Sequence, residues 1–318
     1  NGVVIQRCDI SKTRVGISLK ATETIQNIEV ADCQLHDYIV WCIDVAPRKA
    51  GATFRNITIR NSVFRDYHQH DSGNWQGCGE KPHTDGIFLR TAGMASTWEN
   101  LRISSCDFYA DYPGNSKGGT ASIYVSQGPS VLIYNCTFRS DRHTRAIDVA
   151  ARNPAGIPVQ VVRIYNNSFL FSATPVFLAS ETNRGRREVY IQNNIMVRSG
   201  GRNMVMVNRD SGLAPVIMDN NLYWDPQVGS ATRNVYRDKV YLTFAQTQAR
   251  GYESNGIFAD PRFVNTTTNP PSRRDLRLKA GSAAIRRGAN LSAWFTQDKL
   301  GKPRPATGPW TFGAFEYP

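Results

Sequence analysis

The chain has 318 residues, and its 38 lysines and arginines outnumber its 26 aspartates and glutamates, which gives a net charge of +12 at neutral pH. This length allows a sizeable core, but no apolar run approaches the roughly 18 residues that a membrane span needs, and no nucleic-acid-binding motif is present. The excess of positive charge favours an acidic polysaccharide as partner, with simple solubility as the alternative. No signal peptide is visible, and we expect a secreted protein.

Eight segments share one strand pattern, beginning with the first residues. Each starts with an apolar pair: Val3/Ile5, Ile28/Val30, Ile57/Ile59, Leu101/Ile103, Val131/Ile133, Val162/Ile164, Val189/Ile191 and Val216/Met218. Three residues later comes a small or amide residue: Cys8, Cys33, Ser62, Cys106, Cys136, Asn167, Asn194 or Asn221. Two further on comes Ile10, Leu35, Phe64, Phe108, Phe138, Phe169, Met196 or Tyr223. Alternation with period two indicates strands with one buried face.

The spacing of these segments indicates a solenoid. The middle position recurs at intervals of 25, 29, 44, 30, 31, 27 and 27 residues. A second short strand follows in most repeats, as GISLK, CIDVA, GIFLR, SIYVS, AIDVA, PVFLA and MVMVN. Stacked in register about 4.8 Å apart, such strands make a parallel β-helix. We therefore predict an all-β, single-domain fold of about eight or more rungs, with rungs over residues 1–224 and an inserted loop at 66–85.

A tight turn is expected at the middle position of each repeat. Asparagine precedes it five times, and asparagine tolerates left-handed turns: Asn61, Asn135, Asn166, Asn193 and Asn220. The four cysteines of the column are best explained as stacked buried thiols, although Cys8–Cys33 or Cys106–Cys136 disulfides would also fit the spacing. Cys42 and Cys78 lie outside this column, and no zinc-site spacing appears.

Residues 225–318 depart from the repeat and are predicted to form the last rungs and a cap of the same domain. A short helix is expected near 242–250, followed by NGIFADPRFVN (255–265), DLRLKAGSAAIRRGA (275–289) and TFGAFEYP (311–318). This arrangement resembles the closing segment of right-handed parallel β-helix proteins of the pectate-lyase-like superfamily, and so do the repeats. The resemblance implies a right-handed helix whose open end is capped. Trp294, Phe295, Trp310 and Phe312 are candidates to cover that end.

The second strand should present an outward column of mixed chemistry. Two alternating outward columns are expected: Ser18, Asp44, Phe88, Tyr124, Asp148, Phe177 and Met206, and then Lys20, Ala46, Arg90, Ser126, Ala150, Ala179 and Asn208. Aromatic rings stack on sugars, and arginines pair with carboxylates. We therefore expect a saccharide groove here, against the alternative of an ordinary polar face. Arg145, Arg152, Glu181 and Arg209 flank later rungs as candidates for binding an acidic chain.

The 44-residue interval contains the stretch His68 to Arg90, which should fold over this groove. His83 and Asp85 precede the groove strand, and PHTDGIFL is similar to the NTDGI segment of polygalacturonase-like hydrolases. That resemblance implies a catalytic role for Asp85, with His83 in place of the asparagine; the paired aspartates, GHG and RIK of those hydrolases are absent. A metal site could be formed by His68, His70, Asp71 and His83. We consider it more plausible that these are solvated loop residues. Calcium held by Asp44, Asp85 or Asp148 is a further alternative.

Three functions remain open at this stage. A polysaccharide lyase is favoured, in which Arg90 or Lys20 neutralises a uronate carboxylate and His83, or a deprotonated Tyr124, lysine or arginine, is the base. A glycoside hydrolase would use Asp85 with Asp148, or Asp44 with Asp85. The third is a non-enzymatic tailspike or adhesin module that binds glycan. We expect a monomer, which would favour a secreted enzyme, whereas a stable trimer would favour the spike.

Overall fold

The computed structural model describes most of the chain. Not described are residues 1, 38–39, 67, 70–83, 112–116, 119, 127, 141–142, 152–159, 172, 181–186, 199–202, 209–212, 229–233 and 238–239. Within the described ranges, no helix has the length and apolar character to cross a membrane.

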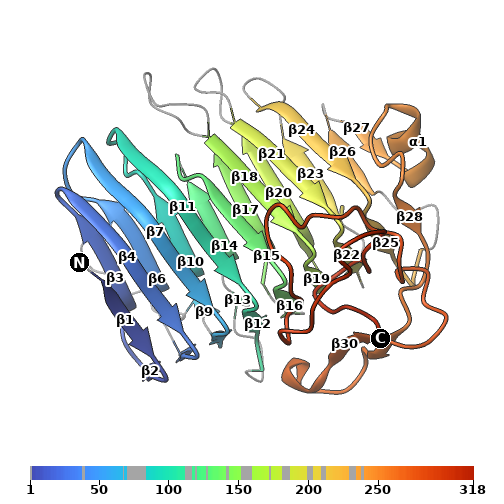
Figure 1. The fold of residues 1–318 in the computed structure, drawn as a ribbon, viewed down its shortest axis with the longest axis horizontal. Helices are drawn as coiled ribbons and strands as arrows, with labels where there is room; N and C mark the ends of the chain where they lie inside the picture. Colours follow the sequence, from blue (N-terminus) through green and yellow to red (C-terminus); the bar gives the residue numbers. More distant parts are fainter. Residues whose placement is uncertain are drawn as a thin grey trace.

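Three parallel sheets run the length of the molecule, one strand per rung in each (Figure 1). Sheet A contains β1 (Val3–Gln6), β4 (Thr24–Ala31), β7 (Ala52–Arg60), β11 (Ser96–Ser104), β15 (Val131–Tyr134), β18 (Gln160–Tyr165), β21 (Arg187–Gln192) and β24 (Leu213–Asp219). Sheet B contains β2 (Asp9–Ser11), β5 (Gln34–His36), β8 (Val63–Arg65), β12 (Asp107–Tyr109), β16 (Thr137–Ser140), β19 (Ser168–Phe171), β22 (Ile195–Arg198), β25 (Leu222–Trp224) and β28 (Ile257–Phe258). Sheet C contains β3 (Val15–Ala21), β6 (Trp41–Pro47), β10 (Asp85–Arg90), β14 (Ala121–Ser126), β17 (Arg145–Ala151), β20 (Thr174–Ser180), β23 (Val205–Asn208), β26 (Val235–Arg237) and the antiparallel β27 (Val240–Leu242). The predicted parallel β-helix is confirmed.

The predicted apolar columns form the core between the sheets. The large residues of sheet B pair in register, and Phe64, Phe108, Phe138 and Phe169 stack with ring centroids 4.9, 4.8 and 4.7 Å apart. All four rings are fully buried. Each buried ring contributes roughly 1.5–3 kcal/mol, and the strand spacing of about 4.8 Å is also a good stacking distance.

The turn from sheet A to sheet B has two residues in every rung. Its first residue always has a left-handed backbone, with φ between 49° and 59°: Arg7, Asp32, Asn61, Ser105, Asn135, Asn166, Asn193 and Asn220. The predicted turn is confirmed. The second residue points inward, and in the later rungs its side-chain amide bonds to the preceding rung. Asn194 Oδ1, for example, accepts from the Asn167 backbone N–H at 2.9 Å. In the same column Cys8, Cys33, Cys106 and Cys136 carry free thiols; Cys78 lies outside the described residues.

Residues after β25 cover both the end and the side of the helix. Leu242 belongs to the main core cluster, and Phe244, Tyr252 and Phe258 pack against it, with Phe244 opening helix α1 (Phe244–Ala249). The chain then forms the antiparallel pair β29 (Phe263–Asn265) and β30 (Asp275–Leu278), with the 3-10 turn η2 (Pro271–Arg273) between them.

The last segment, residues 282–318, runs back along the outside of the rungs, and we call it the C-terminal strap (Figure 1). Phe295 and Trp310 pack on Leu132 and Tyr165 of sheet A, and Phe312 packs on sheet B residues such as Leu170. Trp294 lies beside Tyr165, with ring centroids 6.4 Å apart. The four aromatic residues proposed as an end cap therefore lie on the side instead, because outer-face residues of several rungs offer them apolar contacts.

The loops that lead from sheet B to sheet C in adjacent rungs contact each other. β9 (His68–Gln69) pairs antiparallel with β13 (Lys117–Gly118). Residues 70–83, between β9 and β10, lie outside the described structure, so the expected cover of this loop over sheet C remains a prediction.

Candidate functional site

The outer face of sheet C carries the predicted column of site residues. Ile87 and Leu89 belong to the core, so the residue between them points outward. The column runs in register through Ser18, Asp44, Phe88, Tyr124, Asp148, Phe177 and Met206. It is less exposed than predicted, because Asp44, Asp148 and Phe177 are buried and Phe88 and Tyr124 are half-buried. Neighbouring cations account for part of this cover.

Three charged residues from adjacent strands form the Lys20–Asp44–Arg90 cluster. The buried Asp44 carboxylate accepts from Lys20 Nζ through Oδ2. It also accepts from Arg90 Nε at 3.2 Å and Nη2 at 3.1 Å, in a two-point contact. Burial lowers the pKa of Lys20, and the charges of Arg90 and Arg48 lower it further, while Asp44 opposes them. One carboxylate thus holds two cations, one of which is easier to deprotonate than an ordinary lysine.

A run of three aromatic rings adjoins this cluster. Phe88 lies 5.2 Å from Trp41 and 5.0 Å from Tyr124 between ring centroids, and the second pair is stacked at 9°. The Arg90 guanidinium lies 4.8 Å from the Trp41 ring centroid and 5.1 Å from that of Phe88. Trp41 was not among the site residues predicted from the sequence. It lies on β6, in register with Asp85 on β10. Such rings fix an arginine and offer faces for sugar rings.

A second group of interacting side chains lies on β17 and β20 of the same sheet. Arg145 bonds to the buried Asp148 carboxylate, and its guanidinium lies 3.7 Å from the ring centroid of Phe177. Burial raises the pKa of Tyr124 to about 12, and the negative charge of Asp148 adds to the effect. Tyr124 therefore keeps its proton at neutral pH, which disfavours the predicted role of a deprotonated tyrosine base.

Asp85 begins β10 and is fully buried. Its Oδ1 accepts from the Ala121 backbone N–H at 2.9 Å, whereas its Oδ2 has no hydrogen-bond partner of good geometry among the described residues. Burial raises the pKa of Asp85 well above its ordinary range, with the Ala121 bond opposing and the charge of Asp148 adding. Burial thus favours the protonated form of Asp85 more than that of an ordinary aspartate.

Several predicted site residues lie outside the described structure: His83, Arg152, Glu181 and Arg209. The same holds for His70 and Asp71, whereas only the backbone of His68 is described, in β9. Among the described side chains, no group of three or more His, Cys, Asp and Glu residues is close enough to hold a metal ion. Calcium binding therefore remains a prediction without a described site.

Two clefts lie on other parts of the described surface. One of about 480 Å³ lies over sheet B, between Trp224, Phe263 and Arg274. The other, of about 720 Å³, lies between the strap and the turns that join sheets A and B. The second is taken up below.

No protein-family model matches the chain, and no curated protein matches it significantly. The chemistry of the site must therefore be inferred from its own side chains.

Proposed function

We propose that the protein is a secreted carbohydrate-active enzyme that cleaves a uronate-containing polysaccharide by β-elimination on the outer face of sheet C. The parallel β-helix is compatible with this class and equally with glycan-binding modules. The observation that carries the proposal is the Lys20–Asp44–Arg90 cluster: two cations that converge on one buried carboxylate beside a run of aromatic rings.

The proposed roles follow from the chemistry of elimination. Arg90 pairs with the uronate carboxylate, which acidifies the proton on C5 because the developing charge is neutralised. Lys20, in its neutral form, removes that proton, and its lowered pKa makes this form more accessible. The C5 electrons form a double bond to C4 as the C4–O bond breaks, and water protonates the leaving oxygen. Phe88 and Tyr124 support the sugar rings.

A hydrolase is the second candidate, favoured by the raised pKa of Asp85. A protonated Asp85 would be the general acid and Asp148 the base. Their strands, β10 and β17, are separated by β14 alone, which puts the strand axes about 10 Å apart. Asp85 is level with Arg145, three residues before Asp148, so the two side chains must lean toward each other along the sheet to come within the roughly 9.5 Å of an inverting pair of carboxyl groups.

The test is incubation with pectate, alginate and glycosaminoglycans while ultraviolet absorbance and reducing ends are measured together. Elimination gives an unsaturated uronate that absorbs, and Lys20→Ala and Arg90→Ala should each lower its formation at least about a hundredfold. Lys49→Ala, at an exposed lysine, is the matched control and should retain the wild-type rate. New reducing ends without absorbance, lost in Asp85→Asn and Asp148→Asn, would replace the lyase by the hydrolase.

Absence of cleavage, combined with glycan binding and a stable trimer, would instead support a spike or adhesin module. We expect a monomer by light scattering, since an enzyme with its groove on one sheet needs no second copy.

A further inference from the structure

The larger of the two clefts adjoins none of the sheet C residues. Its floor is the turn between sheets A and B in three successive rungs, including Asn61, Ser105 and Asn135. Its other wall is the strap from Trp294 to Gly301. The volume of about 720 Å³ falls within the range of roughly 300–1,000 Å³ that is usual for small-molecule sites.

The cleft has an excess of positive charge that is available to a ligand. Arg60, Arg102 and Lys299 line it against Asp107 and Asp298. Asp298 is buried, with Oδ1 accepting from the backbone N–H groups of Leu300 and Lys302 and Oδ2 from that of Glu316. Asp107 accepts from Lys299 at 2.9 Å and from Arg139 at 3.0 Å. Both acids of the cleft are therefore already bound within the protein.

Arg102 is the cation of the cleft that lacks an acidic partner among the described residues. Its Nε donates to Asn100 Oδ1 at 2.8 Å and its Nη1 to the Trp294 carbonyl at 3.3 Å, so Nη2 remains available. Arg60 binds Glu29 at 2.6 Å, but both side chains are about one-third exposed, and such pairs are weak enough to exchange for a ligand carboxylate. Two guanidinium groups on neighbouring strands of sheet A can thus meet one anionic chain.

Aromatic and amide groups complete the lining. Tyr134 stacks on Phe295 with ring centroids 4.4 Å apart, and Trp294 is 36% exposed. The Asn61 side chain is exposed and has no hydrogen-bond partner among the described residues. Aromatic rings, amides and guanidinium groups together are what a carboxylated sugar needs for stacking and hydrogen bonding.

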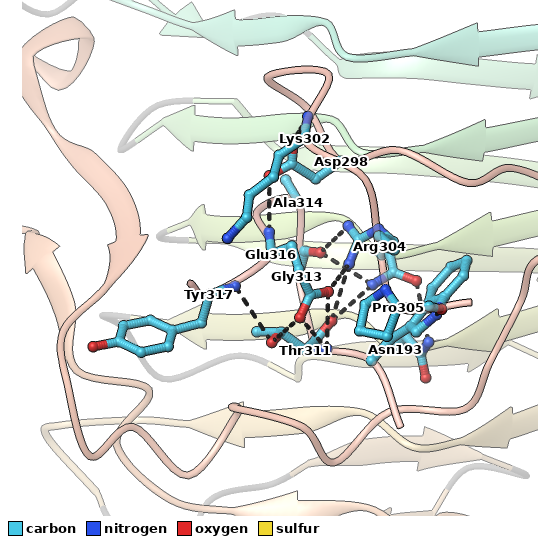
Figure 2. A network of polar contacts seen from close by, with 12 residues as sticks. Asn193, Asp298, Lys302, Arg304, Pro305, Thr311, Gly313, Ala314, Glu316 and Tyr317 are labelled. Atoms are coloured by element: carbon cyan, nitrogen blue, oxygen red, sulfur yellow. Dashed lines mark hydrogen bonds and ion pairs between the residues drawn. The ribbon is translucent and has the colours of Figure 1, made fainter. Parts of the chain in front are cut away.

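The strap wall is held firmly in place, as Figure 2 shows around Arg304 and Glu316. Arg304 donates to Glu316 at 3.0 Å and to the Asn135 side chain at 2.9 Å, and Asn135 in turn donates to the Gln297 carbonyl at 2.7 Å. Lys299 Nζ donates to the Ser105 carbonyl at 2.7 Å. The cleft is therefore formed before any ligand binds, which lowers the entropy cost of binding.

We propose that this cleft is a second binding site for the protein, separate from sheet C, which takes a short uronate oligosaccharide with Arg102 as its main carboxylate contact. The choice of an acidic sugar rests on the proposed function, whereas the site itself rests on the cleft. Its role would be to hold one part of a polysaccharide while another part lies on sheet C.

The test is calorimetric titration of the full chain with tetragalacturonate and with a tetrasaccharide of alginate, using the methyl-esterified form of each as the neutral probe. Wild type should bind two equivalents of an acidic probe, more weakly as salt rises, and should bind the esterified form at least about tenfold more weakly. Arg102→Ala should retain one equivalent. Arg55→Ala, at an exposed arginine of the same sheet outside the cleft, should retain two. Thermal melting checks that each variant is folded.

The two proposals fail in different ways. Unchanged stoichiometry and affinity in Arg102→Ala would overturn the second site whatever happens on sheet C, as would the absence of binding by wild type. Loss of one equivalent in Arg102→Ala but unchanged binding and cleavage in Arg90→Ala would uphold the second site and remove the sheet C proposal.

Discussion

Asp44 is buried beneath two cations, and its carboxylate binds both of them. Lys20 and Arg90 reach it from the strands on either side, β3 and β10, and their side chains remain 18% and 29% exposed. In the proposed reaction Asp44 touches no substrate, so it is a positioning residue. Removal of the Asp44 charge should therefore show how much of the elimination rate depends on the placement of Lys20 and Arg90.

We predict that Asp44→Asn lowers the free energy of unfolding by about 2 kcal/mol, below the 3–5 kcal/mol of a fully buried pair, because both cations can reach water. The elimination rate should fall at least about tenfold, with a shift in its pH profile because Lys20 loses the neighbour that favours its charged form. The measurements are thermal melting and initial rates across pH.

Glu99→Gln is the matched control for this change. It breaks the exposed pair with Arg55, and its melting temperature should stay that of wild type because water screens exposed ion pairs. An Asp44→Asn enzyme with the wild-type pH profile would contradict the positioning role.

At the scale of elements, the inward asparagine ladder ends on an acid. Asn167, Asn194 and Asn221 pass hydrogen bonds from rung to rung, and Glu253 takes the place of the next asparagine. Its Oε1 accepts from Asn221 Nδ2 at 2.7 Å and from the Tyr223 hydroxyl at 2.6 Å. Burial nevertheless raises the pKa of Glu253 to about 7.

This gives a prediction for stability against pH. A carboxyl group whose pKa is raised by folding stabilises the fold when protonated, so its contribution is full below pH 4.5 and is lost as pH rises through 7. The difference amounts to about 3 kcal/mol. Wild type should lose this amount between pH 4.5 and 8 relative to Glu253→Gln, as measured by urea unfolding. Glu23→Gln, at an exposed position, should follow wild type, and parallel curves for wild type and Glu253→Gln would refute the titration of Glu253.

The positions that repeat in every rung were predictable from the sequence. Features that depend on one particular residue or on side chains from other strands were not. The columns through Phe138, Ile147 and Asn167 are periodic, because each rung buries the same positions. Glu253 lies after the last repeat, where no period indicates that a carboxylate replaces an amide. The outward direction of Asp44 and Asp148 followed from alternation, but their burial depends on side chains from other strands, which alternation does not reveal.

At the scale of the whole molecule, the strap ties the last rungs to the middle ones. Arg304, whose side chain is fully buried, contacts Glu316 within the strap and Asn135 in a rung far back in the sequence. Burial lowers the pKa of Arg304 to about 10, still far above neutral pH, so it remains charged. Contacts between residues so far apart in the sequence close long loops and carry no local sequence signal. For this reason we expected the aromatic residues of the strap to cover the end of the helix, whereas they pack on its side.

We predict that Arg304→Met costs about 3–5 kcal/mol, because it leaves the buried Glu316 carboxylate without its cation. The strap should detach before the rungs unfold, so limited proteolysis should cut within residues 282–318 while the remainder stays folded. Arg287→Met, at an exposed strap residue, should resist proteolysis as wild type does. Simultaneous loss of strap and rungs in Arg304→Met would show that the strap has no separate stability.

The two-residue turn between sheets A and B constrains how the chain can change in length. Because each such turn needs a left-handed residue and an inward partner in register, an inserted residue there would shift every later contact of its rung. The other two corners have no fixed length, and both border sheet C. Insertions and deletions can therefore accumulate only where they remodel the rim of the proposed groove, so a protein of this build can acquire a new substrate by exchanging corner loops while its core stays constant.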